Sequence, residues 1–101
     1  MMPAAIADPT ILLARALRLS AQAAGVTMFV VASAERDWAS ATFAGVRHRL
    51  DLAVEPGARL DAWLKALPNA DLRLRGHLVA DLTVDRRDGT IVLDVLTLRA
   101  D

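Results

Sequence analysis

Two histidines are the side chains of this sequence best suited to acid–base chemistry or metal binding, because imidazole titrates near neutral pH and is a common metal ligand. His48 lies in an apolar phase between Val46 and Leu50, and His77 follows Gly76 on the polar face of the third predicted strand. Neither has a second histidine or a carboxylate at the spacing of a metal motif. On adjacent strands the two rings would start on opposite faces unless a bulge intervened. We interpret His48 as a partly buried, hydrogen-bonded histidine near the sheet edge and His77 as a solvated one, with no metal or cofactor.

Four arginines are the next candidates, because alternation places Arg47 with Arg49, and Arg73 with Arg75, on single faces of their strands. A sheet face with four guanidinium groups could hold phosphates or a single-stranded nucleic acid. Aspartates share these faces, however, no aromatic side chain is interleaved for stacking, and the formal net charge is zero. We expect cross-strand Arg–Asp pairs on a solvated face, and nucleic-acid binding remains the weakest hypothesis.

Nucleophilic chemistry has little support in the sequence. Cysteine is absent, which excludes disulfides, thiolate metal sites and thiol catalysis. Ser20, Ser33 and Ser40 lie in alanine-rich surroundings without a G-x-S-x-G motif, and the five glycines are isolated rather than gathered in a phosphate loop. The aspartates do not have the spacing of a calcium loop. The sequence therefore predicts a protein that is not an enzyme.

Composition sets the class of protein. A chain of 101 residues that is 54% hydrophobic is long enough for one core and too apolar to be disordered. Residues 1–7 lack the positive charge of a signal peptide, and no segment approaches the roughly 20 apolar residues of a membrane span. We expect a disordered N-terminal segment over 1–7, a single domain over 8–101 and a cytoplasmic location with no membrane partner. The abundance of alanine and of arginine over lysine is typical of a GC-rich bacterial genome.

Capping signals and periodicity predict the elements that position these side chains. Asp8-Pro9 begins a helix that Gly25 ends, and apolar residues at helical spacing predict a second helix over 58–67. Strands are predicted over 26–34, 38–54, 72–85 and 90–99, with turns at 35–37 and 86–89 and a bulge or bend near Ala44-Gly45. In the third strand, Leu78 is expected to share the buried face with Leu82.

The order α-β-β-α-β-β predicts an α+β fold with one four-stranded antiparallel sheet and both helices on one face. The same order results when the first strand of a ferredoxin-like βαββαβ chain is moved to its end. The two halves match too poorly to be a sequence repeat.

An apolar surplus gives the one positive indication of function. The first and last strands carry apolar residues on both faces, although helices on one side of a sheet bury only one face. Trp38, out of phase with its neighbours, is either a contact for a partner or a cap on the core. The predicted interface residues are Phe29, Val31, Val92, Leu96, Leu98 and Trp38. The leading hypothesis is a non-catalytic interaction module that forms a homodimer through its sheet; the alternatives are a different protein partner or a small apolar ligand on the open face.

Overall fold

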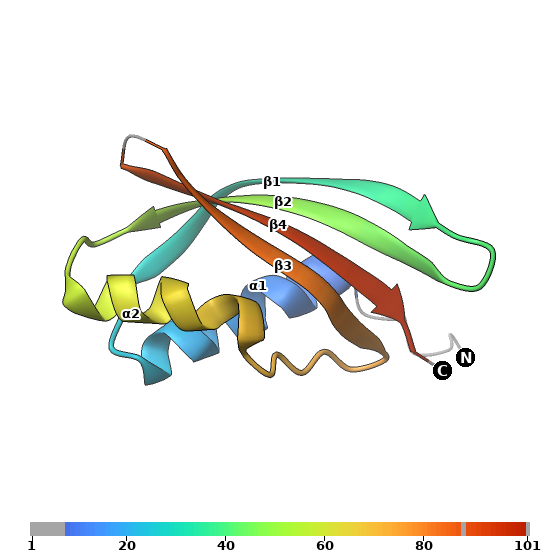
Figure 1. The fold of residues 1–101 in the computed structure, drawn as a ribbon, viewed down its shortest axis with the longest axis horizontal. Coiled ribbons are helices and arrows are strands. Elements are labelled where there is room, and N and C mark those ends of the chain that lie inside the picture. Colours follow the sequence, from blue (N-terminus) through green and yellow to red (C-terminus); the bar gives the residue numbers. More distant parts are fainter. Residues whose placement is uncertain (1–7, 88, 101) are drawn as a thin grey trace, which may run out of the picture.

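The fold is α+β, a four-stranded antiparallel sheet with two helices packed on one of its faces (Figure 1). The computed structural model describes residues 8–87 and 89–100, so the expectation for residues 1–7 lies outside the described part. Its elements are α1 (Pro9–Ala23), β1 (Met28–Ala39), β2 (Ala44–Val54), α2 (Ala58–Ala66), the 3-10 turn η1 (Leu67–Asn69), β3 (His77–Arg87) and β4 (Thr90–Arg99). None of the helices within these ranges has the length and apolar character needed to cross a membrane.

Helix α1 begins and ends where its capping residues predict. Oδ1 of Asp8 accepts a hydrogen bond from the backbone N–H of Thr10 at 2.9 Å, which satisfies one of the donors left free at a helix start. Gly25 follows the helix with a φ of 73°, a left-handed conformation that suits glycine. Leu13, Leu17 and Ala21 are buried against the sheet.

Replacing the cap should weaken this helix measurably. We expect Asp8→Ala to lower the free energy of unfolding by about 1 kcal/mol, because the N–H of Thr10 loses its acceptor. Urea denaturation measures the change. Asp71→Ala is the matched control, since Asp71 is exposed and its carboxylate pairs with the exposed Arg73 at 3.3 Å. Equal losses in the two variants would contradict the capping role.

Helix α2 completes the layer that covers the sheet. Leu60, Trp63 and Leu64 are buried on its inner face, as their helical spacing predicts. Nε1 of Trp63 donates to Oγ of Ser20 at 3.0 Å, which joins the two helices by a side-chain hydrogen bond. The apolar side chains of both helices and of the inner sheet face form one core.

The sheet has the strand order β1-β2-β4-β3, so each αββ unit contributes one central and one edge strand. The central strands pair with each other through Arg49 and Asp94, among other residues. This is also the order that a ferredoxin-like sheet acquires when its first strand is moved to the end of the chain.

The two units are related by an approximate two-fold rotation that their residue identities conceal. Each edge strand has a bulge at its fourth residue, Val31 in β1 and Ala80 in β3. The first pairs after the bulges are Ala32 with Asp51 and Asp81 with Leu96. Counting back along β2 and β4 from these pairs makes Arg49 equivalent to Asp94, and because those two residues also pair with each other, the axis passes between them.

The structure corrects the predicted positions of the first turn and of the bulge. Residues 35–37 belong to β1, and the chain reverses over 40–43, where Oγ of Ser40 accepts from the N–H groups of Thr42 and Phe43. Charged side chains are tolerated in β1 because this part of an edge strand is exposed on both faces. Trp38 therefore lies near the end of β1, and the region of Ala44 is the start of β2 rather than a bulge within a longer strand.

The third strand also begins later than predicted. It starts at His77, and residues 70–76 form a connection held by the buried Leu74. The bulge at Ala80 shifts the alternation of side chains along β3. Leu78 therefore pairs with Leu98 on the face of the sheet away from the helices, the open face, and Leu82 alone is buried although both leucines were expected to be.

Candidate functional site

The outer edge of β1 is an unprotected strand edge on which apolar side chains meet solvent. β1 pairs with β2 on one side, and its other side has no neighbouring strand in the sheet. Every residue from 31 to 37 is exposed, and Phe29 and Val31 have 66% and 63% of their surface in solvent. Unpaired backbone N–H and C=O groups along such an edge are a template for pairing with another strand.

The opposite edge, β3, is better protected. The segment that precedes it folds back on its start through a bridge between Leu74 and His77, and η1 packs against β3. The part of β3 that follows the bulge carries charges at Asp81, Asp85 and Arg86. Charges and covering segments are the usual means by which proteins block edge pairing. β1 also carries charges, at residues 35–37, so the two edges differ in the segment that covers the start of β3 and not in charge.

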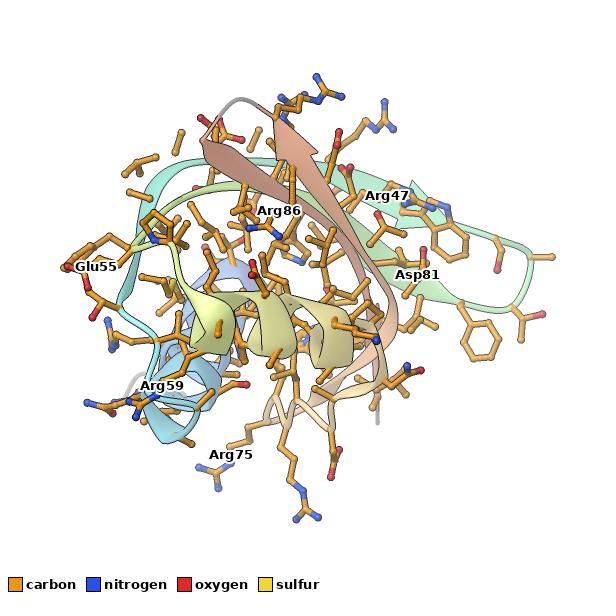
Figure 2. All side chains as sticks on the ribbon, turned by 60° about the vertical axis from the view of Figure 1, so that its left-hand side comes forward. Arg47, Glu55, Arg59, Arg75, Asp81 and Arg86 are labelled. Atoms are coloured by element: carbon orange, nitrogen blue, oxygen red, sulfur yellow. The ribbon has the colours of Figure 1, made fainter. Side chains whose placement is uncertain are left out.

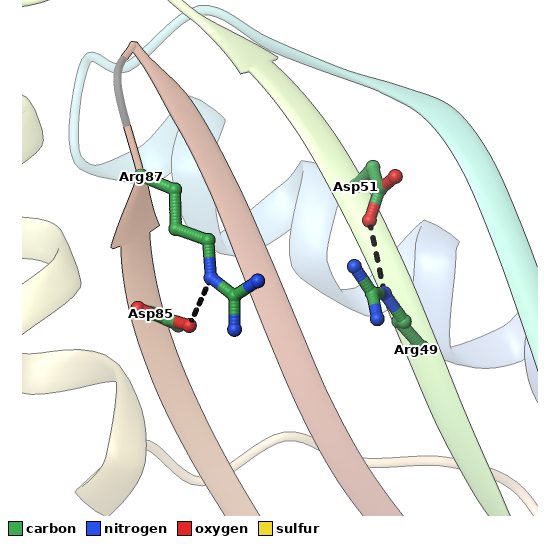
Figure 3. A network of polar contacts seen from close by, with 4 residues as sticks. All are labelled: Arg49, Asp51, Asp85 and Arg87. Carbon is green, nitrogen blue, oxygen red and sulfur yellow. Dashed lines mark hydrogen bonds and ion pairs between the residues drawn. The ribbon is translucent and has the colours of Figure 1, made fainter.

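Two of the predicted interface residues are already buried in the single chain, which corrects the premise that a partner must cover them. Val92 and Leu96 lie on the open face with only 5% and 8% of their surface exposed. Asp51 and Asp85 pair with Val92 from the two neighbouring strands. The ion pairs Arg49–Asp51 at 3.6 Å and Arg87–Asp85 at 2.7 Å lie beside β4 on this face (Figure 3). The aliphatic parts of such side chains can cover apolar neighbours.

Trp38 and Leu98 are both partly buried on the open face. Both pair with Gly45, Trp38 from β1 and Leu98 from β4. Gly45 has no side chain, and a Cβ atom there would overlap the backbone carbonyl oxygen of Thr97, so the sheet leaves no room for a side chain between the two large residues. Phe29 and Val31 are the remaining predicted interface residues, and they are the exposed ones.

The four arginines do not form one surface. Arg47 and Arg49 are in β2, on the open face, whereas Arg73 and Arg75 precede β3 in the connection from η1. In Figure 2 Arg75 lies on the helix side of the molecule, well separated from Arg47 on the sheet. The expected strand start at residue 72 was wrong, and the four-guanidinium face on which nucleic-acid binding depended is absent from the described residues.

His48 lies at the centre of a hydrogen-bond chain that joins four elements. It is buried on the inner face of β2, away from the sheet edge. Its Nε2 is 2.8 Å from Oγ1 of Thr97 in β4, and its Nδ1 is 3.0 Å from Oγ1 of Thr10 in α1. The hydroxyl of Thr10 donates in turn to the carboxylate of Glu35 in β1. Oγ1 of Thr97 is also 3.4 Å from the carbonyl oxygen of Val46.

Burial lowers the pKa of His48 below its ordinary value, because the charged imidazolium loses hydration. Three charged or titratable groups face it from the neighbouring elements. Glu35 from β1 and Asp8 at the start of α1 oppose the lowering, and His77 from β3 adds to it. The pKa is the net result of desolvation against two nearby carboxylates.

His77 lies on the same inner face as His48, because the bulge at Ala80 reverses the alternation of β3. It is half-buried rather than solvated, and its Nε2 has no hydrogen-bond partner among the described residues. With Asp8, Thr97 and Arg99 it lines a pocket of about 250 Å³ beside the start of α1. This pocket is on the helix side, so it is not the open-face groove that the apolar-ligand alternative requires.

Sequence reasoning missed the partners of His48 and the open edge. Thr97 continues the buried phase of Ile91, Leu93 and Val95, so a polar residue in an apolar phase occurs on both central strands. Pairing these two exceptions would have suggested the contact between His48 and Thr97. Nothing in the sequence indicates that Thr10 and Glu35 join the chain, since both depend on how α1 crosses the sheet.

Comparison of the chain with protein-family models, with curated proteins and with solved structures found no match.

Proposed function

We propose that this protein is a non-catalytic, cytoplasmic interaction module that forms a homodimer by pairing β1 with β1 of a second copy. The observation that carries the proposal is the difference between the two sheet edges: a preceding segment covers the start of β3, whereas β1 has no such cover and exposes Phe29 and Val31. Antiparallel addition across a two-fold axis would extend the sheet from four strands to eight and satisfy the free backbone groups of both copies.

Charge selects the register of this pairing. A two-fold axis perpendicular to the sheet places one residue of β1 opposite its own copy, since paired residues must point to the same face. An axis at Glu35, Arg36 or Asp37 would bring like charges together, which is destabilising. An axis at Ala34 pairs Glu35 with Ser33, Arg36 with Ala32 and Asp37 with the bulged Val31, without any like-charge pair. Like charges thus exclude the axes at residues 35–37, and we propose the axis at Ala34.

Introducing a positive or a negative charge at Ala34 tests both the interface and its register. We expect the wild-type protein to show twice the chain mass at high concentration in sedimentation equilibrium. Ala34→Lys alone and Ala34→Glu alone should each weaken dimerisation by roughly tenfold or more, because two like charges then face each other across the axis. An equimolar mixture of the two variants should recover the dimer.

The pseudo-symmetry supplies a matched control. Thr83 occupies in β3 the position of Ala34 in β1, and it is also exposed. Thr83→Lys should leave dimerisation unchanged. A strictly monomeric wild-type protein, or dimers that persist equally in Ala34→Lys and Ala34→Glu, would overturn the proposal; loss of the dimer in Thr83→Lys would place the interface on the other edge.

A further inference from the structure

The pocket beside the start of α1 has the size and surface of a site for a small molecule. Its volume is about 250 Å³, just below the roughly 300–1,000 Å³ of typical ligand pockets. Most of its surface is apolar, and Pro9, Ala44 and Val46 are among the residues that line it. The lining comes from β2, β3, β4 and the start of α1, so the pocket is separate from the edge of β1.

Two opposite charges line this pocket without neutralising each other. Asp8 lines it at the start of α1 and Arg99 lines it from β4, yet within the described part of the chain neither belongs to an ion pair. Oδ1 of Asp8 accepts from the N–H of Thr10, which fixes this carboxylate at the helix start. A molecule that carries both a cationic and an anionic group can pair with the two side chains at once.

His77 adds a second nitrogen donor beside Arg99. The two residues pair across β3 and β4, so both lie on the inner face of the sheet. Nε2 of His77 is buried without a hydrogen-bond partner among the described residues, and a polar atom in that position is costly unless something satisfies it. The terminal torsion of histidine is broad, so the ring can turn Nε2 toward a ligand in the pocket. Arg99 and His77 can thus donate together to one anionic group.

We propose that this pocket binds a small aliphatic zwitterion of the size of a free α-amino acid. Arg99 and His77 hold its carboxylate, Asp8 holds its ammonium group, and its aliphatic part lies against the apolar walls. The inference goes beyond the proposed dimer and does not depend on it, because β1 contributes nothing to the pocket.

L-Valine is a suitable probe, because it carries both charged groups on a small aliphatic frame. In NMR titrations of the full chain we expect L-valine at millimolar concentration to shift the backbone amides of Val46, His77 and Thr97 in a saturable manner. Isovalerate lacks the ammonium group of valine, and isobutylamine lacks its carboxylate. Each of these should bind roughly tenfold or more weakly, because each loses hydrogen bonds to a charged side chain.

Two variants assign each charged group of the ligand to its side chain. Asp8→Asn removes the carboxylate charge but keeps a good helix cap, so it should weaken valine binding by roughly tenfold or more and leave isovalerate binding unchanged. Arg99→Gln should weaken the binding of both valine and isovalerate and leave that of isobutylamine unchanged. Arg75→Gln is the matched control, since Arg75 is exposed and lies outside the lining of the pocket, and it should change none of the three affinities.

The wild-type titrations decide the proposal even if a variant fails to fold. Saturable shifts at the pocket residues, with valine bound more tightly than isovalerate and isobutylamine, would support it. No saturable shift with valine, or a valine affinity no higher than that of isovalerate or of isobutylamine, would overturn the zwitterion site. Unchanged valine binding in a folded Asp8→Asn or Arg99→Gln protein would overturn it as well.

Discussion

Gly45→Ala should lower the free energy of unfolding by about 1–3 kcal/mol, because the added methyl group overpacks the sheet. This is the opposite of the usual effect, since alanine is normally more favourable than glycine in a strand. A Cβ atom at residue 45 would overlap the backbone carbonyl oxygen of Thr97 on β4, and Leu98 Cδ2 would be only 3.0 Å away. The Leu98 side chain can move aside, but the oxygen belongs to the backbone of a central strand, so no rotamer change can relieve the overlap with it. The cost arises from displacing β2 from β4.

Urea denaturation of Gly45→Ala measures this cost, with Ala53→Val as the control for adding side-chain bulk to β2. Ala53 is exposed, so its variant should change the free energy of unfolding by no more than about 0.5 kcal/mol. The displaced residue Thr97 also holds Nε2 of His48, and we therefore expect the hydrogen bond between them to weaken in Gly45→Ala. Equal stability of Gly45→Ala and wild type would show that the strands separate here without cost.

Local signals predicted the helices well, because their ends are encoded by single residues. Asp8 and Gly25 mark α1 through a side-chain acceptor and a positive φ, and neither depends on distant parts of the chain. The turn at 35–37 was predicted wrongly by the same reasoning. A run of charged residues predicts a turn only when the neighbouring strands are assumed to be covered by other parts of the protein. β1 is an edge strand whose second half is exposed, so the charged residues 35–37 can lie within it.

The site was harder to predict, because bulges decide which side chains share a face. One extra residue at Ala80 places His77 on the inner face with His48 and moves Leu78 to the open face. Neither Val31 nor Ala80 has a residue type that marks a bulge. The burial of Val92 likewise depends on neighbours in β2 and β3, whose register no local pattern specifies.

Comparing the two pseudo-symmetric units shows that the polar pair in the core is not demanded by the fold. Counting along the central strands from Arg49 and Asp94 makes Leu93 equivalent to His48 and Leu52 equivalent to Thr97. Both leucines are buried. One half of the core thus places two leucines where the other half places an imidazole and a hydroxyl, and buried polar groups are costly unless fully hydrogen-bonded.

Thr97→Val should therefore cost about 1–3 kcal/mol, because it keeps the shape of the side chain but leaves Nε2 of the buried His48 without its hydrogen-bond partner. His48→Leu should cost less, since the Thr97 hydroxyl can still donate to the Val46 carbonyl and that of Thr10 to Glu35. Urea denaturation of both single variants and of the double variant measures the coupling between the two residues.

In the double variant the imidazole that Thr97→Val leaves unsatisfied is gone, and a leucine takes the place that Leu93 fills in the other half of the core. The double variant should accordingly be more stable than Thr97→Val alone, and the two single effects should not add. It should also lose the fall in stability that the buried His48 causes as the pH drops below about 6.5. Additive losses would show that His48 and Thr97 contribute independently to stability. An unchanged dependence of stability on pH would show that the dependence does not arise from the buried His48.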